Sequence, residues 1–266
     1  MNAARLYGRY VAVSLRAQMQ YPGSFIVTSI GAFAATITDF IAIWALFARF
    51  QRIEGWRFEE VALLYGVISV AFALSDALTR GFDVFGEQFV KTGDFDRILV
   101  RPRSTLLQLL GYELRATRIG RLGQGILAWT VGMHLSGVDW TLGAWATLLF
   151  AVAGGVALFS GILVLQATLA FWTVESLEVA NTLTYGGVEA SQYPMDIYAR
   201  WFRNFLTFVV PLACVSYYPV AAVLGRVDTA GMAGWLRFTP ALGFVFLAVA
   251  TRVWRFGVRR YTSTGS

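Results

Sequence analysis

The sequence is poor in the side chains that most catalytic and metal sites require, with one cysteine, one histidine and one lysine among its 266 residues. The single Cys214 excludes an internal disulfide and a thiolate metal cluster. Because His134 is the only histidine, we do not expect it to act alone as a metal ligand or an acid–base group. We expect it to be a polar residue at the membrane interface. Lys91 lacks the glycine spacing of a phosphate-binding loop, and neither H-E-x-x-H nor G-x-S-x-G occurs. We therefore expect no catalytic residue, metal site or cofactor in this chain, and no ATPase activity of its own.

Charge is scarce as well, because charged residues make up only 14% of the chain, whereas a soluble domain carries about a quarter. Hydrophobic residues make up 57%, and the mean hydropathy is +0.58. This composition predicts an integral membrane protein. The net charge of +6 is distributed along the chain in a way that suits an inner leaflet, so the expected partner is membrane lipid and not nucleic acid.

Apolar runs long enough to cross a bilayer predict six spans within a single membrane domain, residues 1–266. The predicted spans are 24–47, 60–78, 105–135, 142–172, 204–224 and 238–253. The third is longer than a bilayer core, so we expect it to begin in the cytosol and to enter the membrane near Leu122. In the fourth, Gly154, Gly155, Ala157 and Gly161 permit close helix packing. In the fifth, Pro211 and Pro219 predict a kink or a break.

Two further segments are more polar than the spans. Residues 1–22 form an amphipathic pattern in which Arg5, Arg9 and Arg16 share one helical face. Such a helix lies in the headgroup plane with its arginines toward anionic lipid, or else packs on the protein as an ordinary cytosolic helix. Residues 173–203 carry several charges, and we expect a cytosolic or interfacial connection there.

The distribution of basic residues predicts the orientation. Six spans place both termini on one side, and that side collects 17 of the 22 Lys and Arg residues, with Arg200 and Arg203 among them. The positive-inside rule therefore predicts a multi-pass protein of the cytoplasmic membrane with both termini in the cytosol. The five basic residues expected outside are Arg49, Arg52, Arg57, Arg226 and Arg237.

The longest polar interruption, at residues 82–104, separates the second and third spans. Gly93 suits a turn, Asp94 can cap the short helix after it, and Pro102 ends that helix. Ser104 can then cap the next helix. We expect this segment to touch another protein through an apolar knob of Phe95, Ile98 and Leu99, with charges around it (Asp94, Asp96, Arg97 and Arg101). Alternatively, the three apolar side chains pack against the start of the third span.

Two acids fall inside predicted spans. Asp76 precedes Arg80 by four residues, which predicts an ion pair along one helix. Asp39 lies deeper, beside Thr36 and Thr38. Because a charge at that depth costs about 3 kcal/mol, Asp39 is expected to face protein or water. Its two interpretations are a buried structural contact and a role in moving a substrate or a proton.

The polar segment also carries the most specific family signal. The run from Gly93 to Pro102 resembles the most recognisable motif of the permease subunits of type-2 ATP-binding-cassette (ABC) transporters, in a branch of small six-span permeases with largely unassigned substrates. Weaker similarities follow in the same order as in that branch, at residues 55–66, 171–175, 193–194, 211–219 and 261–265. The resemblance implies an all-α fold with an N-terminal interfacial helix, six spans and a coupling helix between spans two and three.

The resemblance also implies a transporter of two permease chains and two cytosolic ATPase chains, which bind ATP and Mg. The second permease is another copy or, as is common in this branch, a different sister chain. We expect export between the two permeases, with Thr36, Asp39, Pro211, Tyr218 and Pro219 at the pathway or the dimer interface. Two alternatives remain, a membrane enzyme that acts on a lipid-linked substrate and an ion-driven secondary transporter. The substrate stays open among lipid, glycan, peptide and drug.

Overall fold

The computed structural model describes residues 3–112, 119–173, 177–226 and 232–262, and within these ranges the chain is helical without strands. This confirms the predicted all-α fold. The long helices are α1 (Ala3–Gln18), α2 (Pro22–Phe50), α3 (Phe58–Leu78), α7 (Ile119–Leu135), α8 (Leu142–Leu169), α9 (Leu177–Ser191) and α14 (Ala241–Arg260). The short helices are α4 (Arg80–Asp83), η1 (Gly86–Val90), α5 (Asp94–Leu99), α6 (Thr105–Leu110), η4 (Met195–Ile197), α10 (Arg200–Asn204), η5 (Phe205–Val209), α11 (Leu212–Val215), α12 (Tyr217–Val223) and α13 (Met232–Leu236).

Four helices are long and apolar enough to cross a membrane, namely α2, α3, α8 and the helix Gly234–Arg260 that contains α14. The helices Arg200–Val209 and Leu212–Val223 form a fifth candidate span if they are taken together, although they meet at an angle of 72°. This bend at Pro211 agrees with the break predicted from the prolines. The described parts of α7 and α9 are shorter, with 17 and 15 residues. The chain is therefore a multi-span membrane protein, and the count of six spans stays a prediction.

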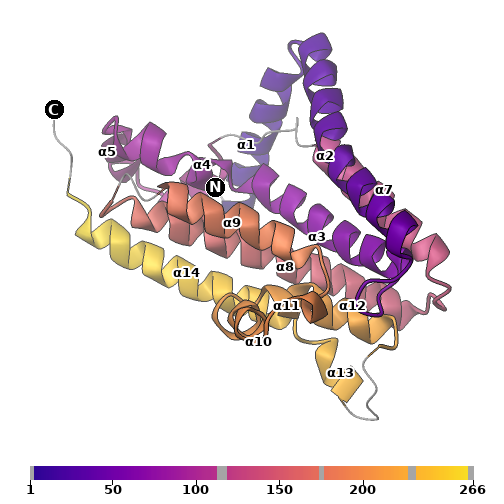
Figure 1. Ribbon diagram of the computed structural model, residues 1–266. Helices are drawn as coiled ribbons and strands as arrows, with labels where there is room; N and C mark the ends of the chain where they lie inside the picture. Colours follow the sequence, from indigo (N-terminus) through magenta and orange to yellow (C-terminus); the bar gives the residue numbers. More distant parts are fainter. Residues whose placement is uncertain (1–2, 113–118, 174–176, 227–231, 263–266) are drawn as a thin grey trace.

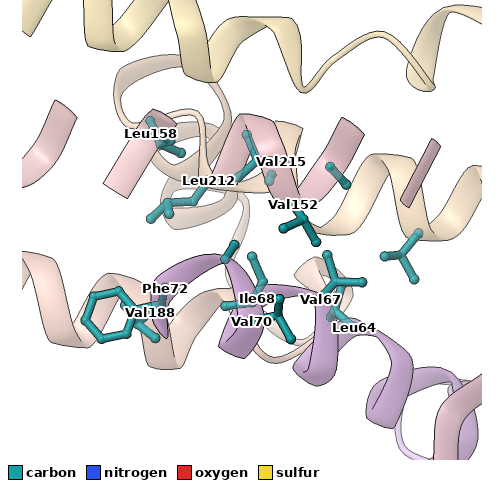
Figure 2. Close-up of a cluster of buried hydrophobic side chains, with 14 of the residues drawn as sticks. Leu64, Val67, Ile68, Val70, Phe72, Val152, Leu158, Val188, Leu212 and Val215 are labelled. Carbon is teal, nitrogen blue, oxygen red and sulfur yellow. The ribbon is translucent and has the colours of Figure 1, made fainter. Parts of the chain in front are cut away.

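Helix α3 lies at the centre of the bundle because almost all of its faces are apolar and buried. Its Leu64, Val67 and Ile68 pack with Val152 of α8 and with side chains of α9 and α11 (Figure 2). Helix α3 lies even closer to α7, since a Cβ atom on Gly66 of α3 would collide with the backbone of Trp129 of α7. The helices α3, α8, α9 and α14 run alongside one another and pack together (Figure 1).

The small residues of the fourth predicted span serve close packing, as expected. A Cβ on Gly154 would meet Pro240 just before α14, and one on Gly161 would meet Phe246 of α14. A Cβ on Gly155 would lie 2.8 Å from Ala71 of α3. In the absence of water between helices, such close approach is the main source of their association. Helix α14 continues to Arg260, past the predicted end at Val253, because buried Trp254 and Gly257 keep this part against the bundle.

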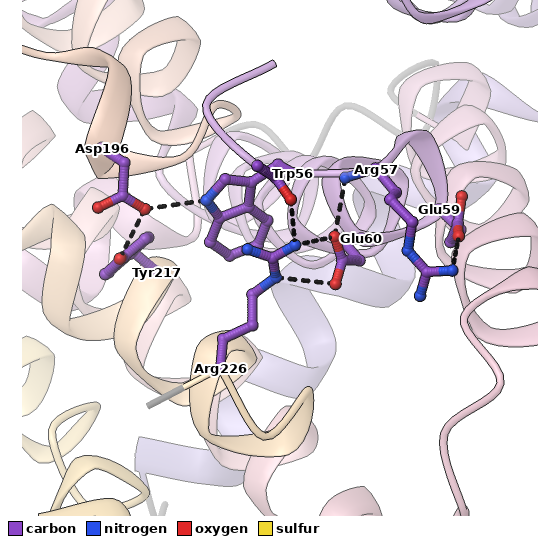
Figure 3. A network of polar contacts seen from close by, with 8 residues as sticks. Trp56, Arg57, Glu59, Glu60, Asp196, Tyr217 and Arg226 are labelled. Atoms are coloured by element: carbon purple, nitrogen blue, oxygen red, sulfur yellow. Dashed lines mark hydrogen bonds and ion pairs between the residues drawn. The ribbon is translucent and has the colours of Figure 1, made fainter. Parts of the chain in front are cut away.

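A network of polar contacts ties together the end of the bundle where α2 meets α3 (Figure 3). The indole of Trp56 donates to Asp196 of η4 (2.9 Å), and the Tyr217 hydroxyl donates to the same carboxylate (2.8 Å). Arg226 binds Glu60 with two nitrogens and lies over the Trp56 ring, 4.2 Å from its centroid. Four segments far apart in the sequence are thereby held at one end of the molecule.

This network corrects the predicted placement of residues 173–203. Arg203 lies 3.9 Å from Asp196, so the helix α10 that carries Arg200 and Arg203 is at the end of Arg57 and Arg226. Neither arginine therefore belongs with the expected cytosolic group. Helix α9, moreover, is no surface connection, because Val188 and Ala190 are buried in the core shared with α3 and α8. Glu175 and the side chain of Glu178 lie outside the described part.

The third predicted span is not one continuous helix. Helix α6 ends at Leu110, a turn follows at Gly111 and Tyr112, residues 113–118 lie outside the described part, and α7 begins at Ile119. The turn is held in place from two sides. Tyr10 of α1 packs directly on Gly111, and the Tyr112 ring lies edge-on to Phe89 at 4.7 Å. The N-terminal helix, described as Ala3–Gln18, therefore contacts the protein while its Arg9 and Arg16 remain exposed.

The revised arrangement leads to a labelling prediction. In a Cys214→Ser background, we expect Arg52→Cys and Arg200→Cys to react with a membrane-impermeant maleimide from one side and Thr92→Cys from the cytosolic side. All three positions are exposed, so reactivity reports the side of the membrane rather than burial. Labelling of Arg200→Cys together with Thr92→Cys would contradict the placement of α10 at the end of the bundle that carries Trp56 and Arg226.

Candidate functional site

The predicted coupling segment forms a compact structure next to the C-terminal end of α14 (Figure 1). Gly93 adopts a φ of +73°, the left-handed conformation that favours glycine, and so lets the chain turn before α5. Asp94 is the first residue of α5, and its backbone N–H bonds to Thr92 Oγ1 at 3.3 Å. Ser104 precedes α6 as predicted, but its side chain makes no capping bond. The turn is as predicted, whereas the capping contacts differ.

The predicted apolar knob is wrong in two of its three members. Phe95 is fully buried and Ile98 nearly so, whereas Leu99 is 39% exposed and its neighbour Val100 is 82% exposed. The Phe95 ring packs against four aromatic rings from three segments, namely Phe85, Phe171, and Trp254 and Tyr261 of α14 and its C-cap, with centroids 5.0 to 6.2 Å away. The alternative, packing on the start of the third span, fits Ile98 better, since its side chain is buried in one cluster with Leu109 of α6. The free apolar surface of the segment is therefore Leu99 and Val100.

A groove of about 830 Å³ lies between this segment and α1. Arg9 of α1 lines one wall, and Arg97 and Arg101 line the other, with Asp94 bound to Arg97 at 3.2 Å. The described lining of the groove holds more guanidinium groups than carboxylates. This surface, with exposed Val100 beside it, is suited to a partner protein that offers an apolar pocket and acidic residues.

A second site lies within the membrane-spanning helices, where α2, α3, α7 and α9 enclose a small polar pocket of about 70 Å³. Its lining consists of Thr36, Asp39, Tyr65, Ser69, Phe72, Arg121, Gln124, Tyr185, Val188, Glu189 and Gln192. Three of these side chains carry formal charge, in a region where one charge costs about 3 kcal/mol unless protein or water faces it. The pocket is therefore the main polar feature among the described spans.

The polar groups of this pocket are only partly paired. Gln192 donates to Ser69 at 3.5 Å, and Tyr65 and Gln124 lie in the same lining. The Gln124 amino group is buried without a hydrogen-bond partner among the described residues. Arg121 lies over the Phe72 ring, 5.2 Å from its centroid, and has no ion pair within that same part of the chain. Within the residues that the structure describes, the guanidinium of Arg121 and the amide of Gln124 thus lie unpaired in the same lining as Asp39 and Glu189, and water or a polar ligand can complete this site.

The pocket opens at the surface of the single chain, because Asp39, Tyr185 and Glu189 are exposed. Just beyond the end of α9, burial raises the pKa of Tyr193, and the charges of Asp39 and Glu189 raise it further. The phenol therefore remains a neutral donor across the physiological range. Charged groups exposed on a spanning surface require a second protein chain or a water-filled path against them.

The structure brings together only part of the predicted pathway. Thr36 and Asp39 line the polar pocket, whereas Pro211, Tyr218 and Pro219 lie in the bent segment from η5 to α12 and do not reach it. Tyr218 instead lies 3.5 Å from Thr207 within that segment. For Arg80, the described ion pair is with Asp83 and not with the predicted partner Asp76. The two acids also differ in exposure, since Asp39 is exposed and Asp76 is buried.

Sequence reasoning missed the residues that complete the polar pocket, namely Arg121, Gln124, Tyr185, Glu189 and Gln192. A helical signal was present, because Tyr185, Glu189 and Gln192 are spaced by four and three residues along one face of α9. This spacing has no meaning for a pocket as long as residues 173–203 are interpreted as a surface connection and Arg121 is counted with the cytosolic group. Among the described residues, no three His, Cys, Asp or Glu side chains group as metal ligands.

Comparison with known proteins identifies the family. Searches of curated proteins and of solved structures each return no match. The sequence model of a family described as "ABC-2 family transporter protein" matches residues 33–265, which include the coupling segment, the polar pocket and the C-terminal helix. With almost its whole length matched and an all-α multi-span fold, the chain belongs to the ABC-2 family of transporter membrane proteins.

Proposed function

We propose that this chain is one of two permease subunits of an exporter in the cytoplasmic membrane, and that ATP hydrolysis by separate cytosolic ATPase chains drives it. Membership of the ABC-2 family supports the transport role itself. The second permease is another copy or a sister chain. Both termini and the coupling segment face the cytosol in this arrangement.

The observation that carries the proposal is the polar pocket exposed on the surface of the spans. Asp39 comes from α2, Arg121 from α7 and Glu189 from α9, and all three line one opening. Against hydrocarbon these charges would be strongly unfavourable, whereas against the same surface of a second permease they enclose a polar path. The substrate would pass there, with Arg121, Gln124 and Gln192 offering donors to its polar groups.

A crosslinking prediction tests this surface. In the Cys214→Ser background, we expect Tyr185→Cys to form a disulfide-linked dimer of permeases on mild oxidation, in membranes that contain the chain and its partners. Val245→Cys on α14 is the matched control, because it is also exposed on a spanning helix but lies away from the pocket. The mass of the linked species identifies a second copy or a sister chain. Crosslinking through Val245→Cys alone would place the interface elsewhere and refute the proposed path.

A second prediction concerns the ATPase partner. Val100→Glu places a charge on the most exposed apolar side chain of the coupling segment, and we expect affinity for the ATPase to fall by about 2 kcal/mol, or roughly 30-fold. Arg97→Ala is expected to cost less than about 1 kcal/mol and to matter less at high salt. Co-purification of the ATPase and titration of the assembled complex measure both effects. Unchanged association of Val100→Glu would show that the segment docks through another face.

A further inference from the structure

Helix α9 separates the polar pocket from a second and quite different cavity. Tyr185, Glu189 and Gln192 face the polar pocket, whereas Thr184, Gly186 and Gly187 face a cavity of about 570 Å³ on the other side. The walls of this second cavity come from α8, α9, α14 and the bent segment α10–η5. Its size is in the range of sites that hold a small organic ligand.

The cavity is apolar, and its few polar side chains have partners within the protein. Thr184 donates to Gln166 Oε1 at 3.0 Å, and Thr168 donates to the Val164 carbonyl at 2.6 Å. Most of the remaining lining consists of aliphatic and aromatic groups such as Leu165, Phe205 and Phe246. Ordered water needs two to four polar partners, and this lining does not supply them. At this depth the surrounding medium is hydrocarbon, so the natural occupant is an acyl chain.

One end of the cavity leads to a row of aromatic and basic groups. Trp172 and Val253 line that end, and the Trp172 ring stacks on Phe256 with centroids 6.4 Å apart. The guanidinium of Arg260 lies 5.2 Å from the centroid of the Phe256 ring. On α14, Phe246, Val253 and Arg260 are spaced by seven residues, which puts them on one face. An exposed Trp next to an exposed Arg is typical of the level of lipid headgroups.

We propose that this cavity holds an acyl chain of an anionic phospholipid whose phosphate lies against Arg260. The apolar lining suits the acyl chain, and Arg260, connected to the lining residue Trp172 through Phe256, gives the site its preference for an anionic headgroup. Because Arg260 lies at the expected cytosolic end, the lipid belongs to the inner leaflet, which is rich in anionic lipids. The site is separate from the polar pocket, and it does not depend on the proposed transport function.

The test uses the full chain in nanodiscs that contain phosphatidylglycerol or phosphatidylcholine, each with a photoactivatable group on the same acyl chain. Irradiation followed by peptide mass spectrometry is expected to label α8, α9 and α14 around the cavity, with more label from phosphatidylglycerol. Gly186→Phe should reduce this label to the background level. A Cβ atom added at Gly186 would have no other atom within 4 Å, so the phenylalanine can enter the cavity without a clash at its Cβ. Gly31→Phe in α2, equally unobstructed, is the control.

The headgroup is tested separately. Arg260→Gln should lower the preference for phosphatidylglycerol over phosphatidylcholine about fivefold, as expected for one basic residue at an anionic surface. Arg252→Gln, exposed on the same helix but outside the Phe246–Arg260 face, should leave the preference unchanged. If Gly186→Phe does not fold, Leu165→Trp fills the same cavity from α8. Label spread evenly over the lipid-facing helices, label unaffected by filling, or equal labelling by the two lipids would each overturn the proposal.

Discussion

Replacing Phe95 by alanine is expected to lower the free energy of unfolding by about 3 to 5 kcal/mol and to release the coupling segment from the bundle. Phe95 is fully buried at the centre of an aromatic cluster, between Phe85, Phe171 and Tyr261. The cavity left by its removal cannot close easily, because its neighbours come from separate segments. Thermal or denaturant unfolding of the purified permease measures the stability, and limited proteolysis within residues 91–104 measures the release.

The matched control is Val100→Ala in the same segment. Val100 is 82% exposed, so its truncation should change the free energy of unfolding by less than about 0.5 kcal/mol while it weakens ATPase association. The two variants therefore separate the structural role of the segment from its role in docking. A Phe95→Ala protein with unchanged stability and unchanged proteolysis would show that the aromatic cluster does not hold the segment.

Replacing Arg226 by methionine is expected to lower the free energy of unfolding by about 3 to 5 kcal/mol, because it leaves the Glu60 carboxylate buried without its cationic partner. Glu60 is only 6% exposed, and Arg226 binds both of its oxygens (Figure 3). Arg226 also donates to the Gly55 carbonyl at 2.6 Å, so its loss should loosen the loop between α2 and α3. Unfolding in detergent measures the change.

Two further variants make the Arg226 result specific. Arg57→Met removes an exposed arginine that pairs with Glu59 at the same end of the bundle, and should cost less than about 1 kcal/mol. Adding Glu60→Gln to Arg226→Met should recover part of the stability, since the unpaired charge is then gone. Equal effects of Arg226→Met and Arg57→Met would mean that the buried pair contributes no more to the free energy of unfolding than the exposed pair.

Several features could be predicted from sequence because they depend on composition and on neighbouring residues. The scarcity of charge indicated a membrane protein, and the motif from Gly93 to Pro102 indicated the family that the comparison confirms. The turn at Gly93 and the bend near Pro211 follow from the backbone preferences of glycine and proline, which act locally. These properties do not require knowledge of which helices touch.

The errors concern residues whose surroundings are supplied by distant parts of the chain. Phe95 and Ile98 looked like an exposed knob because a short amphipathic helix does not reveal what covers its apolar face. Arg203 was assigned to the wrong end because Asp196, and through it Trp56, fixes the position of α10. In each case the deciding partner is far away in sequence, so no local pattern could show it.

The sequence by itself determined that this protein is a helical membrane permease of the ABC-2 type, because hydropathy, charge distribution and one short motif are properties of the chain alone. Only the tertiary structure decided which charges meet within the spans. Asp39, Arg121 and Glu189 come from three helices, and they line one pocket because α2, α7 and α9 pack around α3. Packing between helices depends on the shapes of facing surfaces, and a one-dimensional pattern does not record which surfaces face each other.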